Sequence, residues 1–121
     1  MILADTSVWI DHFRAYDEKL AALLDKGGVL AHPFVIGELA LGNLRRRDLI
    51  LGTLLDLPQA IAATDAETFH FIGAHALHGR GIGYPGAHLL AAVRLTQGAR
   101  LWTHDRRLHD VADALGVAAR P

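Results

Sequence analysis

The sequence ILADTS at residues 2–7 is a short apolar run that ends on Asp5, directly before a helical pattern. The sequence LWTHD at residues 101–105 has the same form and ends on Asp105. Short aliphatic runs followed by helical patterns are typical of strands in a parallel sheet. Ligands bind to such sheets beyond the carboxyl ends of the strands. We therefore expect Asp5 and Asp105 to lie in one shared site.

The same alternation extends through the whole chain and predicts its fold class. Strands are predicted at residues 1–5, 29–31, 59–62 and 99–103. Helices are predicted at residues 7–14, 17–26, 33–45, 48–56, 65–78, 87–96 and 105–115, with a glycine-rich loop at residues 79–86. Strands separated by helices predict an α/β fold with a central parallel sheet and helices on both faces. The 121 residues are enough for one core and too few for two, so we expect a single domain at 1–121.

Composition excludes several classes of protein. The chain has no cysteine, which rules out disulfides and thiolate zinc sites. Its net charge of −1 means that the surface as a whole is not basic, so nucleic acid would have to bind at a local patch. No apolar segment approaches the ~20 residues of a membrane span, and no signal-peptide pattern is present. We expect a soluble cytoplasmic protein that does not bind membranes.

A third acidic residue, Glu38, lies in the apolar segment at residues 33–41, where burial of an ionised group is costly. Carboxylates about 4 Å apart repel each other by roughly 1 to 4 kcal/mol per pair, so three that converge require a cation. Oxygen ligands favour Mg²⁺ or Mn²⁺. Simpler roles stay open at this point. Asp5 and Asp105 each stand where an N-cap is favoured, and Glu38 could pair with an arginine at 45–47.

Five segments together resemble the PIN-domain ribonucleases, and most closely their VapC-type toxins. The segments are DTSVWI at residues 5–10, GEL at 37–39, GIGY and AHLLAA at 81–84 and 87–92, and LWTHDRRL at 101–108. The resemblance implies a Mg²⁺- or Mn²⁺-dependent endoribonuclease toxin of a toxin–antitoxin module. It also implies a homodimer that acts on RNA and is inhibited by a VapB-type antitoxin.

The same resemblance assigns roles to individual residues. Asp5, Glu38 and Asp105 would be the catalytic carboxylates that hold the metal. The hydroxyl groups of Thr6, Ser7 and Thr103 would support them. A separate argument concerns the arginines just beyond Glu38 and Asp105: they could contact RNA phosphates, because recognition of RNA is largely electrostatic, although such clusters are more often solvated faces. These arginines are Arg45, Arg46, Arg47, Arg106 and Arg107.

One position departs from the family pattern. The family has an aspartate just before the AHLLAA helix, and this chain has Gly86 there, preceded by Pro85. We expect Gly86 to serve as the helix N-cap, so that the fold survives while the site loses one of about four carboxylates. His88 lies two residues further along a helix and points elsewhere. The sequence thus predicts a weakened ribonuclease or, alternatively, a catalytically silent scaffold that binds an antitoxin or RNA.

A different class of protein, the phosphoacceptor signalling domain, also carries acids at strand ends. It requires paired acids after the first strand and a lysine at a late strand end, whereas Lys19 and Lys26 both fall in the second predicted helix.

The apolar residues of the first two helices and of residues 34–44 exceed the needs of one small core. We therefore expect part of that surface to contact another chain.

Overall fold

The computed structural model describes residues 1–121 and contains a three-stranded parallel sheet surrounded by seven helices. The strand order is β2 (Val29–Leu30), β1 (Ile2–Ala4) and β3 (Arg100–Trp102). Leu3 of the central strand is in register with Leu30 on one side and Leu101 on the other. The predicted α/β class with a central parallel sheet is confirmed.

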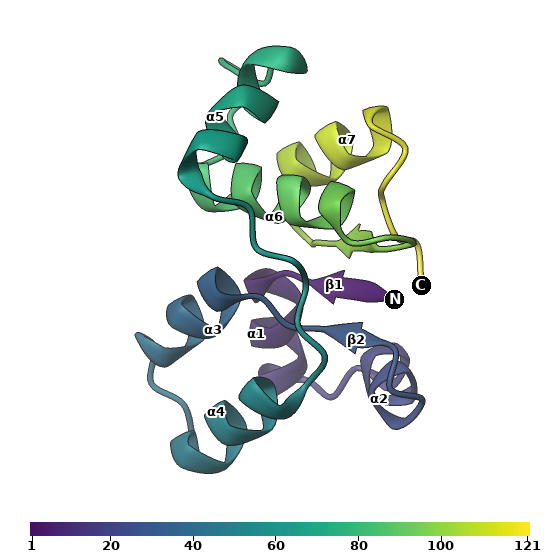
Figure 1. The fold of residues 1–121 in the computed structure, drawn as a ribbon. Helices are drawn as coiled ribbons and strands as arrows, with labels where there is room; N and C mark the ends of the chain where they lie inside the picture. The colour runs from purple at the N-terminus through teal and green to yellow at the C-terminus, as the bar shows by residue number, and fades with distance from the viewer.

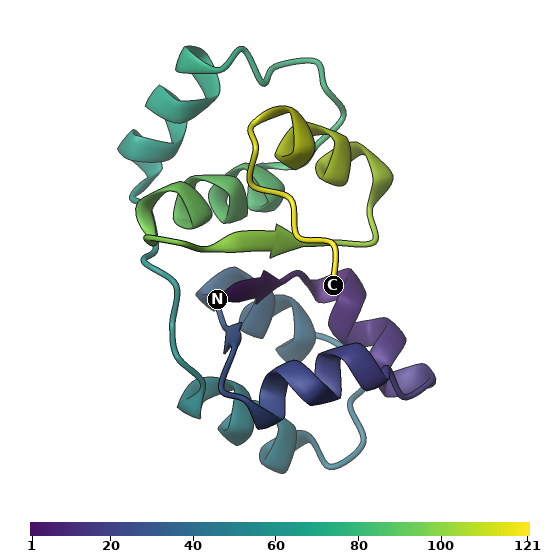
Figure 2. The ribbon, with the colours of Figure 1, turned by 90° about the vertical axis from the view of Figure 1, so that its right-hand side faces the viewer.

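The helices divide into two groups around the central strand. They are α1 (Thr6–Arg14), α2 (Glu18–Asp25), α3 (Pro33–Ala40), α4 (Arg47–Asp56), α5 (Asp65–Ala74), α6 (Tyr84–Leu95) and α7 (Arg106–Ala114). Figures 1 and 2 show α1 to α4 on one side of β1 and α5 to α7 on the other. The two halves of the chain therefore meet at the sheet, where β1 and β3 end side by side.

Helix α6 has more buried residues than any other helix. Seven consecutive residues of this helix, Ala87–Val93, are buried. Four of them belong to the apolar core cluster that includes Leu3 and Leu101, both fully buried; they are Leu89, Leu90, Ala92 and Val93. Burial of each such leucine stabilises the fold by roughly 1.5 to 3 kcal/mol. Packing of the middle of α6 within the protein fixes the position of this helix. Its first turn then lies at the carboxyl edge of the sheet.

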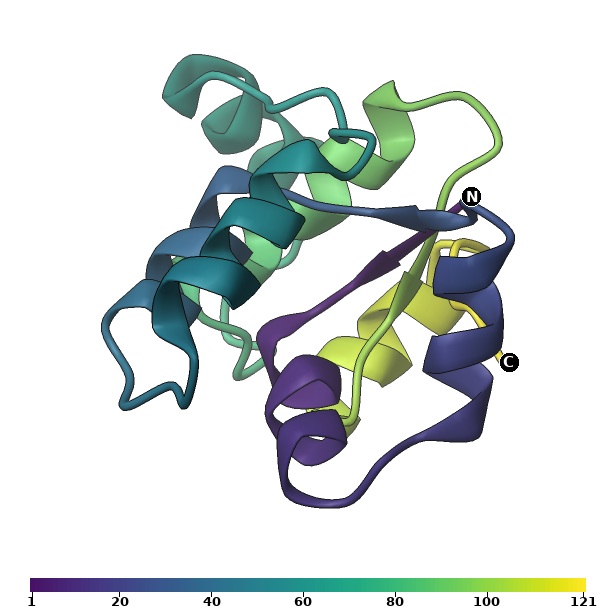
Figure 3. The same cartoon turned by 90° about the horizontal axis from the view of Figure 1, so that it is seen from below.

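Two predicted elements in the first half are wrong in extent. The helix that begins at Pro33 ends at Ala40 rather than near residue 45, because the Gly42 amide closes a tight turn on the Leu39 carbonyl at 3.1 Å. Residues 59–62 form no strand beyond a single bridge between Ala31 and Gln59. The Ile61 amide donates to the Thr96 hydroxyl instead of to a neighbouring strand. Figure 3 shows α3 and α4 side by side beneath this region.

Two helix ends in the second half also differ from the prediction. Helix α5 ends at Ala74, five residues before Gly79, and Ala76 has a left-handed backbone with φ of 50°. Helix α6 begins at Tyr84 with Gly83 as its N-cap. Gly86 is therefore the third residue of the helix and not the N-cap, because proline suits a first helical turn and extends the helix backwards. None of the seven helices combines the length and hydropathy of a membrane span.

Candidate metal site at the carboxyl edge of the sheet

Asp5 lies immediately after β1 and is fixed by two neighbours. Its Oδ1 accepts a hydrogen bond from the Ser7 amide at 2.9 Å, which makes it the N-cap of α1. Its Oδ2 accepts from the Thr103 hydroxyl, which reaches it from the end of β3. Asp5 is buried. The capping role is thus real, and it also holds the carboxylate in one orientation.

The Thr103 hydroxyl joins the ends of the two strands. Besides donating to Asp5, its Oγ1 accepts from the Asp105 amide at 3.0 Å. Ser7 Oγ lies 3.4 Å from Thr103 Oγ1 and accepts from the His104 amide at 3.0 Å. Ser7 and Thr103 therefore lie where supporting hydroxyls were expected, and they connect the loop after β3 to the start of α1.

Asp105 is the N-cap of α7, and its Oδ1 accepts from the Leu108 amide at 3.2 Å. Glu38 projects from α3, and its Oε1 accepts from the Thr6 hydroxyl at 3.0 Å. The expectation that Glu38 is buried in an apolar segment is wrong, because α3 buries only one side, through Val35 and Leu39. Glu38 is exposed and makes no ion pair with the arginines beyond it.

The three carboxylates line one pocket of about 210 Å³. Its other walls come from the glycine-rich loop and the first turns of α6 and α7; they are Ile82, Gly83, Pro85, Gly86, Leu89 and Leu108. Gly86 thus stands at the pocket, as the family pattern predicts for the missing aspartate. A Cβ placed on Gly86 would lie 3.1 Å from Leu108 Cδ1. The space beside the glycine is therefore taken by an apolar side chain that can rotate.

The donors of this pocket suit a hard divalent cation, since Mg²⁺ and Mn²⁺ prefer carboxylate oxygens. No group of three or more acidic or histidine side chains in the structure is arranged to hold a metal ion. Mg²⁺ usually keeps several waters and is held by one or two carboxylates together with substrate phosphates. The pocket therefore fits a hydrated ion held by few protein ligands, and it does not fit an enclosed four-carboxylate site.

The arginines around the pocket differ in whether their side chains already contact other parts of the protein. Arg45 and Arg46 line a groove that begins at Glu38. The Arg47 guanidinium donates to the Ala40 carbonyl at 2.9 Å. The Arg107 side chain lies across Gly81, where a Cβ would be 2.7 Å from Arg107 Cδ. Arg106, Arg45 and Arg46 are therefore the better placed of the five for contact with a ligand.

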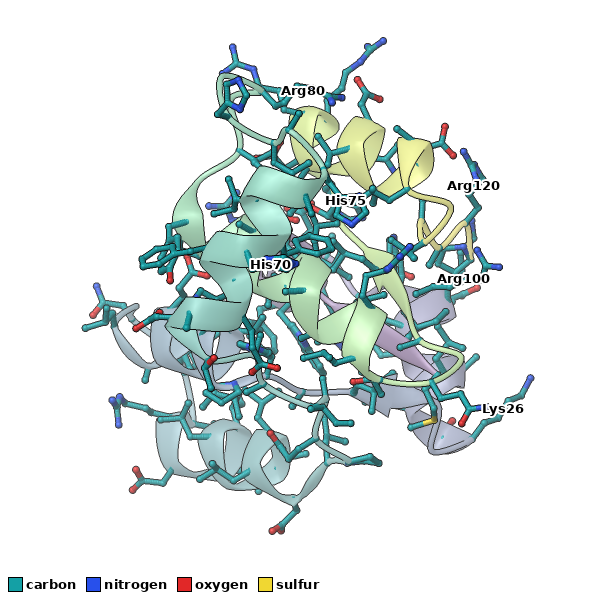
Figure 4. All side chains as sticks on the ribbon, turned by 45° about the horizontal axis from the view of Figure 1, so that its top comes forward. Lys26, His70, His75, Arg80, Arg100 and Arg120 are labelled. Carbon is teal, nitrogen blue, oxygen red and sulfur yellow. The ribbon has the colours of Figure 1, made fainter.

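The structure also places the histidines. His70 and His75 line an apolar hollow between α5 and α6, and Figure 4 labels both. His78 lies beyond the end of α5, although the helix predicted at residues 65–78 would have included it. His88 points away from the carboxylate pocket: its Nε2 lies 3.0 Å from Asp65 Oδ1 and its Nδ1 3.3 Å from Thr68 Oγ1. It does not replace the missing aspartate.

The contact of Asp65 with both Tyr84 and His88 was not foreseen. The sequence could have indicated that Tyr84 and His88 lie together, because residues four apart share one face of a helix. Nothing in the sequence indicated that their common partner would be Asp65.

His32 is buried and is the N-cap of α3, where its Nδ1 accepts from the Phe34 amide at 3.0 Å. Its Nε2 is buried and has no hydrogen-bond partner. Burial, together with the neighbouring His88, lowers the pKa of His32 to about 4. His32 therefore stays neutral in the folded protein under conditions in which an exposed histidine is protonated.

This pKa predicts a loss of stability in mild acid. Between pH 6.5 and about 4 the unfolded chain binds a proton at His32 and the folded chain does not, so the free energy of unfolding decreases as the pH falls. We expect His32 to account for on the order of 2 kcal/mol of this decrease. Urea denaturation at pH 7 and pH 4.5 should show a smaller decrease for His32→Asn, which keeps an N-cap acceptor. An equal decrease in both proteins would contradict the prediction.

Known proteins resemble this chain over almost its whole length. The PIN-domain family model matches residues 2–114. Ribonuclease VapC32 of Mycobacterium tuberculosis, from two strains, is 48% identical over 118 residues, which are 98% of this chain and 95% of the relative. The crystal structure of FitAcB from Neisseria gonorrhoeae has the same fold, with a TM-score of 0.64 at 21% identity, and covers 98% of this chain and 95% of that one. The chain therefore belongs to the PIN-domain family, as a VapC-type member.

Proposed function

We propose that the chain is a Mg²⁺- or Mn²⁺-dependent endoribonuclease toxin of a toxin–antitoxin system, weakened by Gly86. The observation that carries the proposal is that Asp5, Glu38 and Asp105 line one pocket in a chain that is 48% identical to a ribonuclease. We place its activity in the cytoplasm, where cellular RNA is accessible.

In this proposal Asp5 and Asp105 hold the cation and Glu38 orients a water or the substrate at the exposed side of the pocket. When bound, a divalent cation lowers the pKa of a coordinated water and stabilises charge on the leaving oxygen. Thr103 connects the Asp5 carboxylate to the backbone of Asp105, because its hydroxyl donates to Asp5 Oδ2 and accepts from the Asp105 amide. Thr6 limits the rotation of Glu38.

RNA would approach along the groove that begins at Glu38, where Arg45 and Arg46 offer guanidinium groups to phosphates. Arg106 would contribute from the other rim. The test is cleavage of a generic single-stranded RNA with Mn²⁺ present and with the metal chelated. Cleavage only with Mn²⁺ supports the proposal, and equal cleavage with the metal chelated contradicts it.

A specific observation also favours the second candidate, a silent scaffold that binds an antitoxin or RNA. The wall of the pocket at the start of α6 presents only Pro85, Gly86 and Leu89, and Leu108 fills the space beside the glycine. A scaffold would bind its partner normally and show no cleavage at any Mn²⁺ concentration.

The partner in either case is proposed to be a VapB-type antitoxin seated in the groove beside Glu38. This groove of about 510 Å³ is lined by apolar residues of α1, α3 and α4, including Ile10 and Phe13, which are each 38% exposed. Arg14, Arg45 and Arg46 border it. An apolar surface edged by cations suits a partner segment with apolar and acidic side chains.

Phe13→Glu is expected to weaken antitoxin binding by at least about tenfold, because it places a charge in the apolar floor of this groove. Tyr16→Glu is the matched control, since Tyr16 is 72% exposed and lies outside the groove. Co-purification and calorimetry with the product of the neighbouring gene would measure both. Equal weakening by the two variants would place the antitoxin elsewhere. Light scattering of the free chain tests the proposed homodimer.

A further inference from the structure

The first turn of α6 forms one wall of the carboxylate pocket. Its own residues provide little stabilisation for this turn. Its N-cap, Gly83, has no side chain, and no side-chain hydrogen bond caps the helix. The preceding segment contains Gly79 and Gly81, both with positive φ. Glycine loses more conformational freedom on folding than any other residue. Accurate placement of this wall therefore requires a contact from elsewhere in the fold.

Asp65 supplies this contact from α5. The Tyr84 hydroxyl donates to Asp65 Oδ1 at 2.5 Å, and His88 Nε2 lies 3.0 Å from the same oxygen. Tyr84 and His88 occupy the first and fifth positions of α6, so one carboxylate oxygen spans the first turn of the helix. Partial burial and this hydrogen bond raise the pKa of Tyr84 to about 12, which keeps the hydroxyl a donor.

Asp65 is itself held in place. It is the first residue of α5, whose N-cap Thr64 forms a capping box with Glu67. His88 is held on its other side by Thr68, which is fully buried. The His88 ring also lies 4.4 Å from the Phe34 ring of α3, the helix that carries Glu38. The network therefore connects α5 to two of the helices that line the pocket.

We infer that Asp65, acting through Tyr84 and His88, is a positioning residue that sets where the start of α6 stands relative to the carboxylates Asp5 and Asp105. This inference deepens the proposed function and rests on it for its consequence in catalysis. Asp65 does not line the pocket. Its effect reaches the pocket through residues 83 to 86, so it is strongest for a side chain carried at position 86.

Three variants separate positioning from general stability. Asp65→Ala removes the acceptor, while Asp65→Asn keeps Oδ1 to accept from Tyr84 and His88. Asp48→Ala is the matched control, because Asp48 lies in the first turn of α4 and has the same favourable interaction with a helix N-terminus. We expect Asp65→Ala and Asp48→Ala to lower the melting temperature by similar small amounts.

Hydrogen exchange gives a readout that needs neither metal nor RNA. The Ala87 amide donates to the Gly83 carbonyl at 3.1 Å and reports the first turn of α6. We expect Asp65→Ala to speed its exchange by about tenfold through local opening, with Asp65→Asn and Asp48→Ala near the parent. The Asp5 amide, which bonds to the Trp102 carbonyl, should be unaffected. Unchanged exchange at Ala87 in Asp65→Ala, or equal effects of Asp65→Ala and Asp65→Asn, would overturn the inference.

Calorimetry with Mn²⁺ links the network to the pocket. In the parent chain, Asp65→Ala should leave Mn²⁺ affinity unchanged, because position 86 has no side chain. Combined with Gly86→Asp, the same substitution should weaken Mn²⁺ binding by about tenfold relative to Gly86→Asp alone. Equal Mn²⁺ affinity with and without Asp65→Ala in that background would contradict the inference. If no chain binds Mn²⁺ at all, the proposed function fails and the exchange experiment still decides the role of Asp65.

Discussion

Asp5→Asn is expected to weaken Mn²⁺ binding by more than about 100-fold, because loss of a direct ligand should exceed the 10- to 100-fold cost of losing an outer partner. Asparagine keeps an oxygen that can accept from the Ser7 amide, so the cap of α1 is retained. Its amide nitrogen would face Thr103 Oγ1, which is able to accept. The variant should therefore fold normally, and calorimetric titration should report only the loss of the ligand.

Asp17→Asn and Asp25→Asn are the controls for this experiment. Asp17 caps α2 by accepting from the Lys19 and Leu20 amides, and Asp25 is the last residue of the same helix. Neither lines the carboxylate pocket. Both should bind Mn²⁺ within about twofold of the parent, because distant surface charges are screened. Equal affinities for all three variants would remove Asp5 from the metal site.

Gly86→Asp is expected to increase Mn²⁺-dependent RNA cleavage by about 10- to 100-fold and to make expression of the chain toxic to cells. The backbone at position 86 is helical, so an aspartate side chain is compatible with it. It would also lie in the first turn of α6, where a negative charge is favourable. The parent chain should fold normally and cleave weakly or not at all.

Leu108 provides a check on this result. The new Cβ would stand 3.1 Å from Leu108 Cδ1, so the leucine must rotate or shift by a few tenths of an ångström. A modest loss of stability, of about 1 kcal/mol, should accompany the gain in activity. Gly86→Asn is the matched control, because it has the same size without the charge. Strong cleavage by the parent chain with no gain in Gly86→Asp would show that position 86 is not part of the working site.

The sequence predicted those parts of the site that depend on strand ends. The runs before Asp5 and Asp105 are apolar and short, and parallel pairing necessarily brings their carboxyl ends to one edge. The exposure of Glu38 could not be foreseen, because it depends on how α3 is turned against the sheet. The segment near Gln59 was mistaken for a strand, since its composition suits burial. The Ile61 amide of this segment instead donates to the Thr96 hydroxyl, and Thr96 is distant in sequence.

The start of α6 was misplaced for a related reason. Four glycines between residues 79 and 86 are typical of a loop, and only tertiary contacts select the point at which the helix begins. Tyr84 is fixed there by its hydrogen bond to Asp65, which lies 19 residues earlier in the chain. Local sequence patterns carry no information about such a partner.

The pairing of the first strand with the last has a consequence for synthesis. Asp5 is joined to the end of β3 by the Thr103 hydroxyl and by the bond from its own amide to the Trp102 carbonyl. A ribosome releases the N-terminal residues first. A nascent chain therefore displays Asp5 and Glu38 long before Asp105 exists, and the pocket forms only after β3 has been made and has paired with β1. A chain that ends before residue 105 would therefore keep Asp5 and Glu38 but lack the pocket that they share with Asp105.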